Sequence, residues 1–317
     1  MNAIDFSPKH NILIRHKDGI LTPMDVPYYE TTQIDENTWQ IMSSGDYHYL
    51  LVGDEAGVAI DTGYGAGNLR EYLEKLCGKP VPWVINTHHH FDHSANNFYF
   101  DMAYMGEEAL PLASIPYPSF DGITFPAPDY PKTAVSDGDI ISLKGRELEI
   151  IRIGDHTADG IAILDRTHRL LFTGDEIMEH GKTLNGTVSK WKNDLEKLLA
   201  HKDEFDAIYG GAQKVADDAL EIFYEAACKI LDGEEPVECE TQKSAAAADG
   251  EPRLEKPHKS GQRPPMTDER DADGHIIYDC QFPHSADVPK DGFFKKNPNM
   301  IDVVYRGYQF SYDKTML

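Results

Sequence analysis

The sequence predicts an α/β (α+β) fold, a four-layer sandwich in which two β-sheets pack face to face and helices cover their outer sides. Two sets of short apolar segments, separated by glycines and turns, have the length and composition of β-strands. Segments with apolar residues at helical spacing follow each set. Because a sheet and an amphipathic helix must each bury an apolar face, this order favours two sheets covered by helices.

The composition is that of a soluble globular protein, and 317 residues suffice for one large α/β domain with extensions, or for two domains. A formal net charge of −24 repels phosphate backbones and anionic lipids, so we expect neither nucleic acid nor membranes as partners. The first ten residues lack the basic-then-apolar pattern of an export signal, and no apolar run is long enough to cross a bilayer. We therefore expect a cytoplasmic protein.

The first set of predicted strands follows an N-terminal arm at residues 1–37, which mixes charges with prolines and shows no sustained periodicity. From Trp39 the pattern is that of a β-meander, and Leu69, Tyr72 and Leu76 then recur at helical spacing. The predicted strands are residues 39–42, 47–52, 57–60, 82–86 and 103–105, and the predicted helices are residues 68–77 and 96–100.

Residues 109–132 interrupt this pattern with six prolines interleaved with aromatic residues. A long irregular segment inside a domain is usually either functional or disordered. The aromatic content favours a folded loop, and we expect this loop to form a wall of the substrate pocket.

A second set of strands and helices completes the predicted main domain. The predicted strands are residues 140–143, 148–153, 161–164, 170–172 and 207–209, and the predicted helices are residues 188–200 and 214–231. Residues 165–168 form a turn between two of these strands, which predicts that His168 faces solvent.

The composition changes at Gly233. Residues 233–274 are rich in charged residues, proline and alanine, which indicates an acidic polar linker or excursion. Residues 275–317 are again rich in aromatic residues, and residues 303–312 are predicted to pair as a terminal strand. We do not expect this tail to fold alone; it should dock on the main domain or on a partner subunit, as in a homodimer.

Residues 87–96, Thr-His-His-His-Phe-Asp-His-Ser-Ala-Asn, carry the strongest chemical signal in the chain. They follow a predicted buried strand, and strand ends in layered α/β folds are common active-site positions. His88 and His90 can reach one metal ion, whereas Asp92 and His93 can turn toward a second. A solvated loop that happens to be rich in histidine is the alternative, but it leaves the spacing His-x-His-x-Asp-His unexplained.

This motif resembles that of the metallo-β-lactamase superfamily, and three further segments strengthen the resemblance. Residues 59–63 look like the family's strand-ending Asp-Thr-Gly, residues 154–157 are similar to its Gly-x-His-Thr, and residues 171–175 look like its Thr-Gly-Asp. The resemblance extends over roughly residues 35 to 232 and leans toward the glyoxalase-II-like hydrolases. It implies an αβ/βα sandwich with metals at one edge, and a metallo-β-lactamase-like domain at residues 38–232.

The resemblance implies a binuclear site for two divalent metal ions, zinc foremost, with manganese or iron as alternatives. The implied ligands are His88, His90 and His156 for the first ion, Asp92 and His93 for the second, and Asp175 as the bridge. Asp92 would be the catalytic residue that orients the nucleophile or takes its proton. Asp61 would lie behind the ligands and accept a ring N–H from a histidine, although capping of the turn at Thr62 explains it equally well.

Two departures from the family pattern affect this picture. The family supplies a last histidine in a Gly-His-Gly turn, where residues 208–213 read Ile-Tyr-Gly-Gly-Ala-Gln. The second ion should therefore bind more weakly unless another residue substitutes, and the candidates are His180, which is otherwise a candidate substrate contact, His275 and His284. Asp155 is an unusual neighbour for a ligand histidine, and adds either a charge or an outer contact.

These residues predict a metal-dependent hydrolase that uses a metal-activated hydroxide on an ester, thioester, lactone or amide of a small molecule. The weakened second site leaves two alternatives: a mononuclear iron dioxygenase-like enzyme, or a non-catalytic binding protein with a degenerate metal site. Retention of Asp92, His93 and Asp175 favours the hydrolase.

Overall fold

The computed structural model describes residues 12–15, 19–23, 29–43, 46–63, 68–113, 117–119, 123–125, 130–179, 181–212, 214–234, 270–279 and 299–317. Its larger sheet has seven strands in the order β11-β8-β7-β6-β5-β4-β3. Strands β3 to β6 form an antiparallel meander, and β6, β7, β8 and β11 run parallel. The bounds are β3 Glu30–Asp35, β4 Thr38–Ser43, β5 Asp46–Val52, β6 Gly57–Ile60, β7 Trp83–Ile85, β8 Met102–Gly106 and β11 Lys132–Val135.

The second sheet has six strands in the order β12-β13-β14-β15-β17-β18. Strands β15 and β17 run parallel, and every other neighbouring pair is antiparallel. The bounds are β12 Ile140–Ser142, β13 Glu147–Arg152, β14 Ile161–Asp165, β15 Leu170–Gly174, β17 Ala207–Gly210 and β18 Lys214–Val215.

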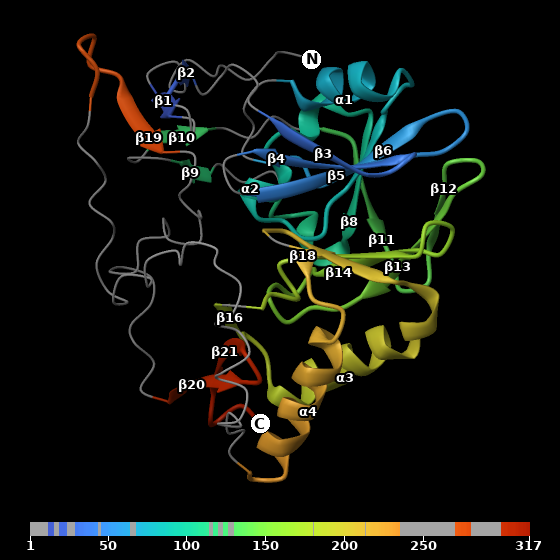
Figure 1. The fold of residues 1–317 in the computed structure, drawn as a ribbon, viewed down its shortest axis with the longest axis vertical. Coiled ribbons are helices and arrows are strands. Elements are labelled where there is room, and N and C mark those ends of the chain that lie inside the picture. The colour runs from blue at the N-terminus through green and yellow to red at the C-terminus, as the bar shows by residue number, and fades with distance from the viewer. Residues whose placement is uncertain are drawn as a thin grey trace, which may run out of the picture.

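The two sheets form the inner layers of a sandwich whose outer layers are helical (Figure 1). Helix α1 (Leu69–Cys77) covers the seven-stranded sheet, and α3 (Val188–Ala200) and α4 (Ala219–Leu231) cover the six-stranded sheet. Successive residues of one strand serve different layers, since Leu50 packs in the cluster beneath α1 whereas Leu51 packs in the cluster between the sheets. The predicted four-layer α/β sandwich is confirmed.

The helices begin and end at residues suited to those positions. The Asn68 side chain caps α1 by accepting a hydrogen bond from the backbone N–H of Glu71, and Gly78 ends this helix with a positive φ of 68°. The Thr187 side chain caps α3 in the same way, through the N–H of Lys190. Short helical segments complete the list: α2 Phe91–Ser94 and the 3₁₀ turns Asn97–Tyr99, Glu107–Ala109 and Lys202–Glu204.

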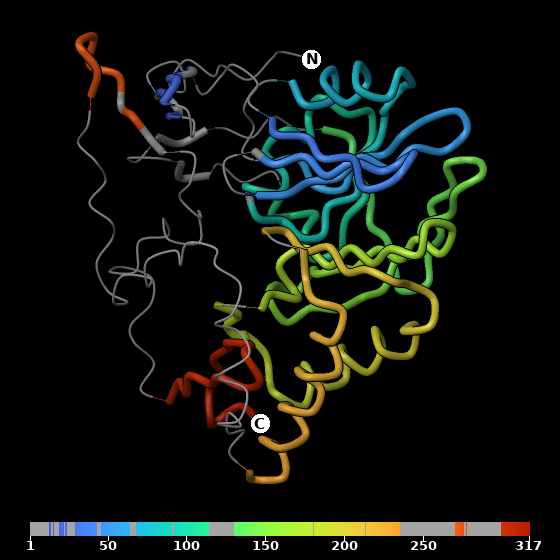
Figure 2. Tube along the Cα trace, in the orientation of Figure 1, coloured from blue at the N-terminus to red at the C-terminus, as the bar shows by residue number. Residues whose placement is uncertain are grey.

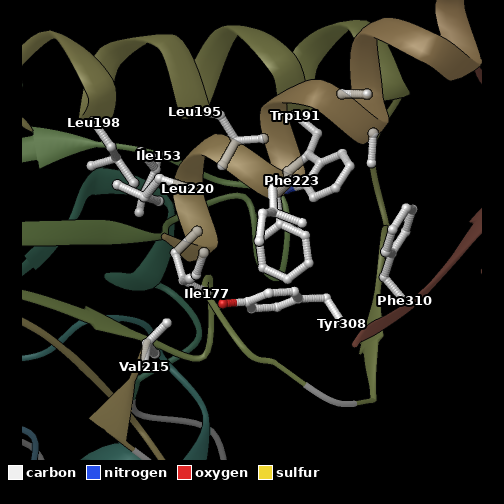
Figure 3. Packing of buried hydrophobic residues seen from close by; sticks show 14 of the residues in the cluster. Ile153, Ile177, Trp191, Leu195, Leu198, Val215, Leu220, Phe223, Tyr308 and Phe310 are labelled. Atoms are coloured by element: carbon white, nitrogen blue, oxygen red, sulfur yellow. The ribbon is translucent and has the colours of Figure 1, made fainter. Parts of the chain in front are cut away.

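A C-terminal hairpin, β20 (Met300–Tyr305) and β21 (Tyr308–Asp313), packs against α3 and α4. Phe310 lies with its ring centroid 5.2 Å from that of Trp191, and Tyr308 stands edge-on to Phe223 at 5.1 Å (Figure 3). The short strand β16 (Lys182–Thr183) pairs in parallel with β21 and so joins the hairpin to the segment after β15.

Two smaller sheets lie outside the sandwich. Strands β1 (Ile12–Arg15), β2 (Leu21–Pro23) and β19 (Ile276–Asp279) form one of them, and β1 lies parallel to β19 although 260 positions separate them (Figure 2). Strands β9 (Tyr117–Ser119) and β10 (Ile123–Phe125) form an antiparallel pair. No helix in the described ranges is both long and apolar enough to span a bilayer.

The structure corrects several expected elements. Residues 214–231 were predicted to be one helix, but residues 214–215 add strand β18 to the sheet, and α4 begins only at Ala219. The helix expected at residues 96–100 is only the 3₁₀ turn Asn97–Tyr99, because β8 begins at Met102 and leaves no length for further helical turns. Residues 303–312 form two strands instead of one, since Arg306 and Gly307, both with positive φ, turn the chain back. The segment predicted to be irregular at residues 109–132 contains β9, β10 and the start of β11.

Candidate metal centre

The candidate site lies at one edge of the sandwich, where the segments that follow strands β7, β13, β15 and β17 meet. The backbone joins these segments directly: Ile161 N–H donates to the carbonyl of Thr87, and Gly211 N–H donates to the carbonyl of Gly174, both at 2.9 Å. The segment after β7 carries the histidine motif, and the motif is tied to the end of β6 by a hydrogen bond from Thr62 N–H to the carbonyl of His93. Ligand types far apart in the sequence are thereby brought to one place.

A first group of three imidazoles comprises His88, His90 and His156, with one ring nitrogen of each within 4.8 Å of the others. Their ring centroids lie 4.6 to 4.9 Å apart, and His156 Nε2 is 3.2 Å from His90 Nδ1. Burial lowers the pKa of all three, to about 3 for His156. The rings are therefore neutral near pH 7 and present lone pairs to a common point, as ligands of one cation must.

A second group shares His88 with the first and adds His93 and Asp175. His93 Nε2 lies 3.5 Å from Asp175 Oδ2, and His156 Nε2 lies 3.8 Å from the same oxygen. Asp175 thus stands between the two groups, at the position expected of a bridge. Burial opposes the charge on His93, but the carboxylates of Asp175, Asp61 and Asp92 outweigh it and raise the pKa of His93 well above its usual value. A site with this excess of negative charge favours a cation.

A third group consists of Asp46, Asp92 and His93. Asp92 lies in α2, with Oδ2 4.0 Å from His93 Nε2, and its side chain is 20% exposed. Asp46 is the first residue of β5 and is 8% exposed. Asp46 was not among the ligands predicted from the sequence.

Asp61 holds the histidine motif from behind. One carboxylate oxygen accepts the backbone N–H of Thr87 at 2.8 Å, and the other bonds Thr87 Oγ1 at 2.7 Å and His93 Nδ1 at 2.9 Å. Thr87 Oγ1 in turn lies 3.0 Å from His88 Nδ1. Both imidazoles are therefore held by Nδ1, which leaves Nε2 of each facing the centre.

Three ligand-type atoms at this centre are buried and make no hydrogen bond within the described part of the chain: His88 Nε2, His93 Nε2 and Asp175 Oδ1. A buried polar atom without a partner is costly, and here three of them belong to one group. A divalent cation would satisfy all three at once. The residues present therefore fit a divalent metal ion.

A buried ionic network supports the loop that carries His156. Glu176 accepts the backbone N–H groups of Asp155 and His156, at 3.1 and 2.8 Å. The Lys182 ammonium lies 2.9 Å from Asp155 and 3.4 Å from Glu176, and all three side chains are at most 6% exposed. Burial opposes the charge on Lys182, but the two carboxylates outweigh it and raise its pKa. Asp155, whose role the sequence left open, thus pairs with a buried lysine.

The remaining predicted histidines have other surroundings. His89 Nδ1 pairs with the buried carboxylate of Asp159 at 2.7 Å. His168 does not simply face solvent as predicted, because its Nδ1 lies 3.0 Å from Asp35 Oδ2 and its side chain is only 20% exposed. His275 pairs with Asp271 and belongs to a separate group with Asp271 and Asp273. The predictions for His180 and His284 fall outside the described residues.

Two glycines permit the close approach of the loops. A Cβ atom at Gly174, which has a φ of 51°, would lie 2.3 Å from Thr87 Oγ1. A Cβ atom at Gly211 would lie 2.1 Å from Asp175 Oδ1 and 2.9 Å from His93 Cε1. The turn that lacks the expected histidine therefore leaves no room for any side chain at residue 211.

Asp46, Glu176 and Lys182 were not predicted as site residues from the sequence. Asp46 precedes every motif of the resemblance, and Lys182 stands in no recognisable pattern. Glu176 had one available signal, since it directly follows the Thr-Gly-Asp segment and a carboxylate there must find a partner when buried.

Comparison with known proteins agrees with this geometry. A family model described as the metallo-beta-lactamase superfamily matches residues 47–222. The human acyl-coenzyme A thioesterase MBLAC2 is 29% identical over 164 residues, which cover 41% of this chain and 58% of the relative. A hydroxyacylglutathione hydrolase of Maricaulis maris is 27% identical over 165 residues, covering 51% of this chain and 60% of that protein. A probable metallo-hydrolase of Methanocaldococcus jannaschii is 30% identical over 184 residues, which cover 53% of this chain and 88% of that protein.

Solved structures share the fold. A metallo-beta-lactamase from Pontibacter korlensis superimposes with a TM-score of 0.52 at 17% identity, over 63% of this chain and 99% of that one. An inverting sec-alkylsulfatase from a Pseudomonas species gives a TM-score of 0.55 at 13% identity, over 70% of this chain and 49% of that one. These likenesses establish the architecture of the sandwich.

Proposed function

The chain belongs to the metallo-beta-lactamase superfamily, and on this premise we propose that it is a metal-dependent hydrolase that cleaves the thioester of a small acyl substrate. The observation that carries the proposal is the convergence of His88, His90 and His156 with His93 and Asp175 at one edge of the sandwich. Imidazole and carboxylate groups are the side chains that would hold the metal ions of a hydrolytic centre.

Divalent ions held by these residues would supply hydroxide near neutral pH and would polarise an acyl carbonyl. The protein's own contribution is to position groups around the reacting acyl carbon. Asp92, partly exposed beside His93, is placed to orient the nucleophile and to accept its proton. Asp61 accepts a hydrogen bond from His93 Nδ1, so that Nε2 of His93 faces the centre.

The thioester class is supported by the relatives. The acyl-coenzyme A thioesterase and the hydroxyacylglutathione hydrolase both carry, in their names, the hydrolysis of an acyl-sulfur bond. An Aspergillus fumigatus relative, 23% identical over 168 residues, is an acyl-carrier-protein thioesterase. This chain spans only about half to three fifths of the length of these relatives, 58%, 60% and 49% respectively, so the acyl group and its carrier remain part of the proposal.

The test is release of free thiol from a panel of thioesters by protein stripped with a chelator and then reloaded with zinc or manganese. The panel contains short-chain and long-chain acyl-coenzyme A and an acylglutathione, with p-nitrophenyl acetate as an oxygen ester. We expect thiol release that disappears on chelation and in His88→Ala and Asp175→Ala. An intact, metal-loaded protein that releases no thiol from any of these thioesters would refute the proposal, and one bound iron with oxygen consumption would indicate the dioxygenase alternative.

A further inference from the structure

A carboxylate at the start of β5 lies beside the turn that lacks a histidine. We propose that Asp46 supplies the missing ligand, so that Asp46, Asp92, His93 and Asp175 hold the second cation. The inference rests on the proposed function, because it concerns the second site of that same metal centre.

The position of Asp46 is set by the turn itself. The backbone N–H of Tyr47 donates to the carbonyl of Gly211 at 2.6 Å, which joins the start of β5 to the turn after β17. Tyr49 Oη reinforces this junction through a hydrogen bond to the carbonyl of Gly210. The residue next to Tyr47 therefore lies against the place from which the family's histidine would reach the metal.

The turn cannot supply a ligand of its own from residue 211. A Cβ atom there would overlap Asp175 Oδ1 and His93 Cε1, which are members of the site. With this space already filled, a fourth donor must approach from another element. A carboxylate oxygen of Asp46 lies within 4.8 Å of ligand atoms of both Asp92 and His93.

The centre shows independently that it is incomplete without a cation. His93 is fully buried, Asp61 occupies its Nδ1, and its Nε2 makes no hydrogen bond with any described residue. Asp175 Oδ1 is likewise buried and makes no hydrogen bond within the described ranges. His93 belongs both to the group of Asp46 and Asp92 and to the group of His88 and Asp175, so Asp46 lies next to a centre that lacks positive charge.

His48 is the rival ligand. It lies two residues along the same strand, is 1% exposed, and neither ring nitrogen has a hydrogen-bond partner among the described residues. Its nitrogens, however, belong to none of the ligand groups formed by the described residues, whereas Asp46 belongs to one. The Tyr29 ring packs against His48 at nearly a right angle, with ring centroids 6.1 Å apart.

The substitution changes the chemistry of the second site. Replacing a neutral imidazole by Asp46 gives three carboxylates and one imidazole at the second site, whereas the first site would have three imidazoles and the shared carboxylate of Asp175. Carboxylate donors suit manganese and other hard cations, and imidazoles suit zinc. The two sites should therefore differ in selectivity, and the preference for zinc over manganese should be weaker at the second site than at the first.

The experiment measures metal binding in the absence of substrate. Full-length protein is stripped with a chelator, loaded with one equivalent of zinc to fill the three-histidine site, and titrated with manganese, with free Mn²⁺ measured by electron paramagnetic resonance. Asp46→Asn should weaken manganese binding by roughly 100-fold or more, because losing a direct ligand should cost at least as much affinity as losing a residue that only orients a ligand. Asp54→Asn, which removes an exposed carboxylate beyond the other end of β5, should bind like the wild type.

Further variants separate the possible results. Unlike Asp46→Asn, Asp46→His should still bind a second ion, and the second site should now prefer zinc over manganese. A merely structural role for Asp46 would not predict this change in preference. His48→Gln should leave manganese binding unchanged. If Asp46→Asn fails to fold, as judged by circular dichroism, Asp46→His and Asp46→Glu carry the comparison.

The inference is overturned if Asp46→Asn binds manganese like the wild type, if His48→Gln loses it instead, or if the wild type never holds a second ion. A wild type with one ion and thioesterase activity would leave the proposed function standing as a mononuclear hydrolase. A wild type that holds two ions but hydrolyses no thioester, together with an Asp46→Asn variant that holds one ion, would support Asp46 as a ligand and refute the proposed function.

Discussion

Asp61 shows how much one side chain contributes to this site. It is 2% exposed, adopts a positive φ of 57°, and bonds Thr87 twice and His93 once. A non-glycine residue in this conformation is uncommon and costs on the order of 1–3 kcal/mol, so the contacts around it must compensate. Those contacts fix the orientation of the histidine motif.

We predict that Asp61→Asn weakens metal binding by about 10-fold to 100-fold while the fold is retained. The amide of asparagine keeps the shape but loses the charge that favours the Nδ1–H form of His93. Isothermal titration with zinc measures the change, and Asp101→Asn, on an exposed carboxylate paired with Arg70, is the control. Unchanged affinity in Asp61→Asn would show that this carboxylate only caps its turn.

Gly211→Ala should abolish binding of at least one of the two ions. The new Cβ atom would lie 2.1 Å from Asp175 Oδ1 and 2.9 Å from His93 Cε1, and neither side chain can withdraw without leaving the centre. Elemental analysis after dialysis measures ions per chain, and Ala212→Ser, at the exposed neighbour, should keep the wild-type content. Wild-type metal content in Gly211→Ala would mean that the turn is freer to move than its contacts indicate.

Among the elements, the turn between β12 and β13 joins the two sheets through Arg146. Its guanidinium bonds Asp165 at the end of β14, and also reaches the carbonyl of Asn37 and the hydroxyl of Thr38 in the other sheet, each at 2.7 Å. Arg146 and Asp165 are 1% and 0% exposed. This buried pair therefore fixes the register between layers that are distant in the sequence.

Arg146→Met should lower the free energy of unfolding by about 3–5 kcal/mol, because it leaves the carboxylate of Asp165 buried without its counter-charge. Urea unfolding followed by circular dichroism measures the loss. Arg169→Met breaks an exposed pair with Asp206 and should have a much smaller effect, because solvent screens an exposed ion pair. Equal losses in the two variants would contradict the importance assigned to burial.

The complete fold includes the C-terminal hairpin as part of its core. Phe310 and Tyr308 pack beside Trp191 and Phe223 (Figure 3). Strand β21 pairs with β16, and Lys182 of β16 forms an ion pair with Asp155, next to His156. The last residues of the chain are thereby connected to the metal centre through one short strand.

Phe310→Ala should lower the free energy of unfolding by about 3–5 kcal/mol, since it leaves a cavity among aromatic side chains. Phe310 is 2% exposed, whereas Ile301 on the partner strand is 38% exposed, so Ile301→Ala should have a much smaller effect. Thermal and urea unfolding measure both. A loss in Phe310→Ala no larger than that in Ile301→Ala would show that the hairpin contributes little to stability.

Removing metal should destabilise the whole sandwich, because a ligand that binds only the folded state stabilises it by mass action. Metal at about 100 times its dissociation constant contributes about 2.7 kcal/mol. Chelation should therefore lower the Tm by several degrees, at about 2–4 °C per kcal/mol for a domain of this size. Calorimetry with and without chelator measures the shift, which should be much smaller in His88→Ala; equal shifts in both proteins would locate the effect elsewhere.

Local patterns in the sequence were enough to predict most strands, helices α1 and α3, and the four layers, because alternation and helical spacing report which face of an element is buried. His88, His90, Asp92 and His93 could be named as candidate ligands from the sequence, because they are close together and stand after a strand; their role stays a prediction. These features depend on neighbouring residues only. The start of the last helix was wrongly predicted at residue 214, because pairing of residues 214–215 with β17 outweighed the local helical pattern.

The grouping of distant residues had no such local signal. Asp46 meets His93, Lys182 meets Asp155, and Arg146 meets Thr38 only because the two sheets pack and their loops converge at one edge. Burial makes each pairing necessary, since a buried charge or donor must find a partner, but it does not name the partner in the sequence. The histidine motif was thus readable from local sequence, while the full set of groups at the candidate metal centre depended on the packing of the folded chain.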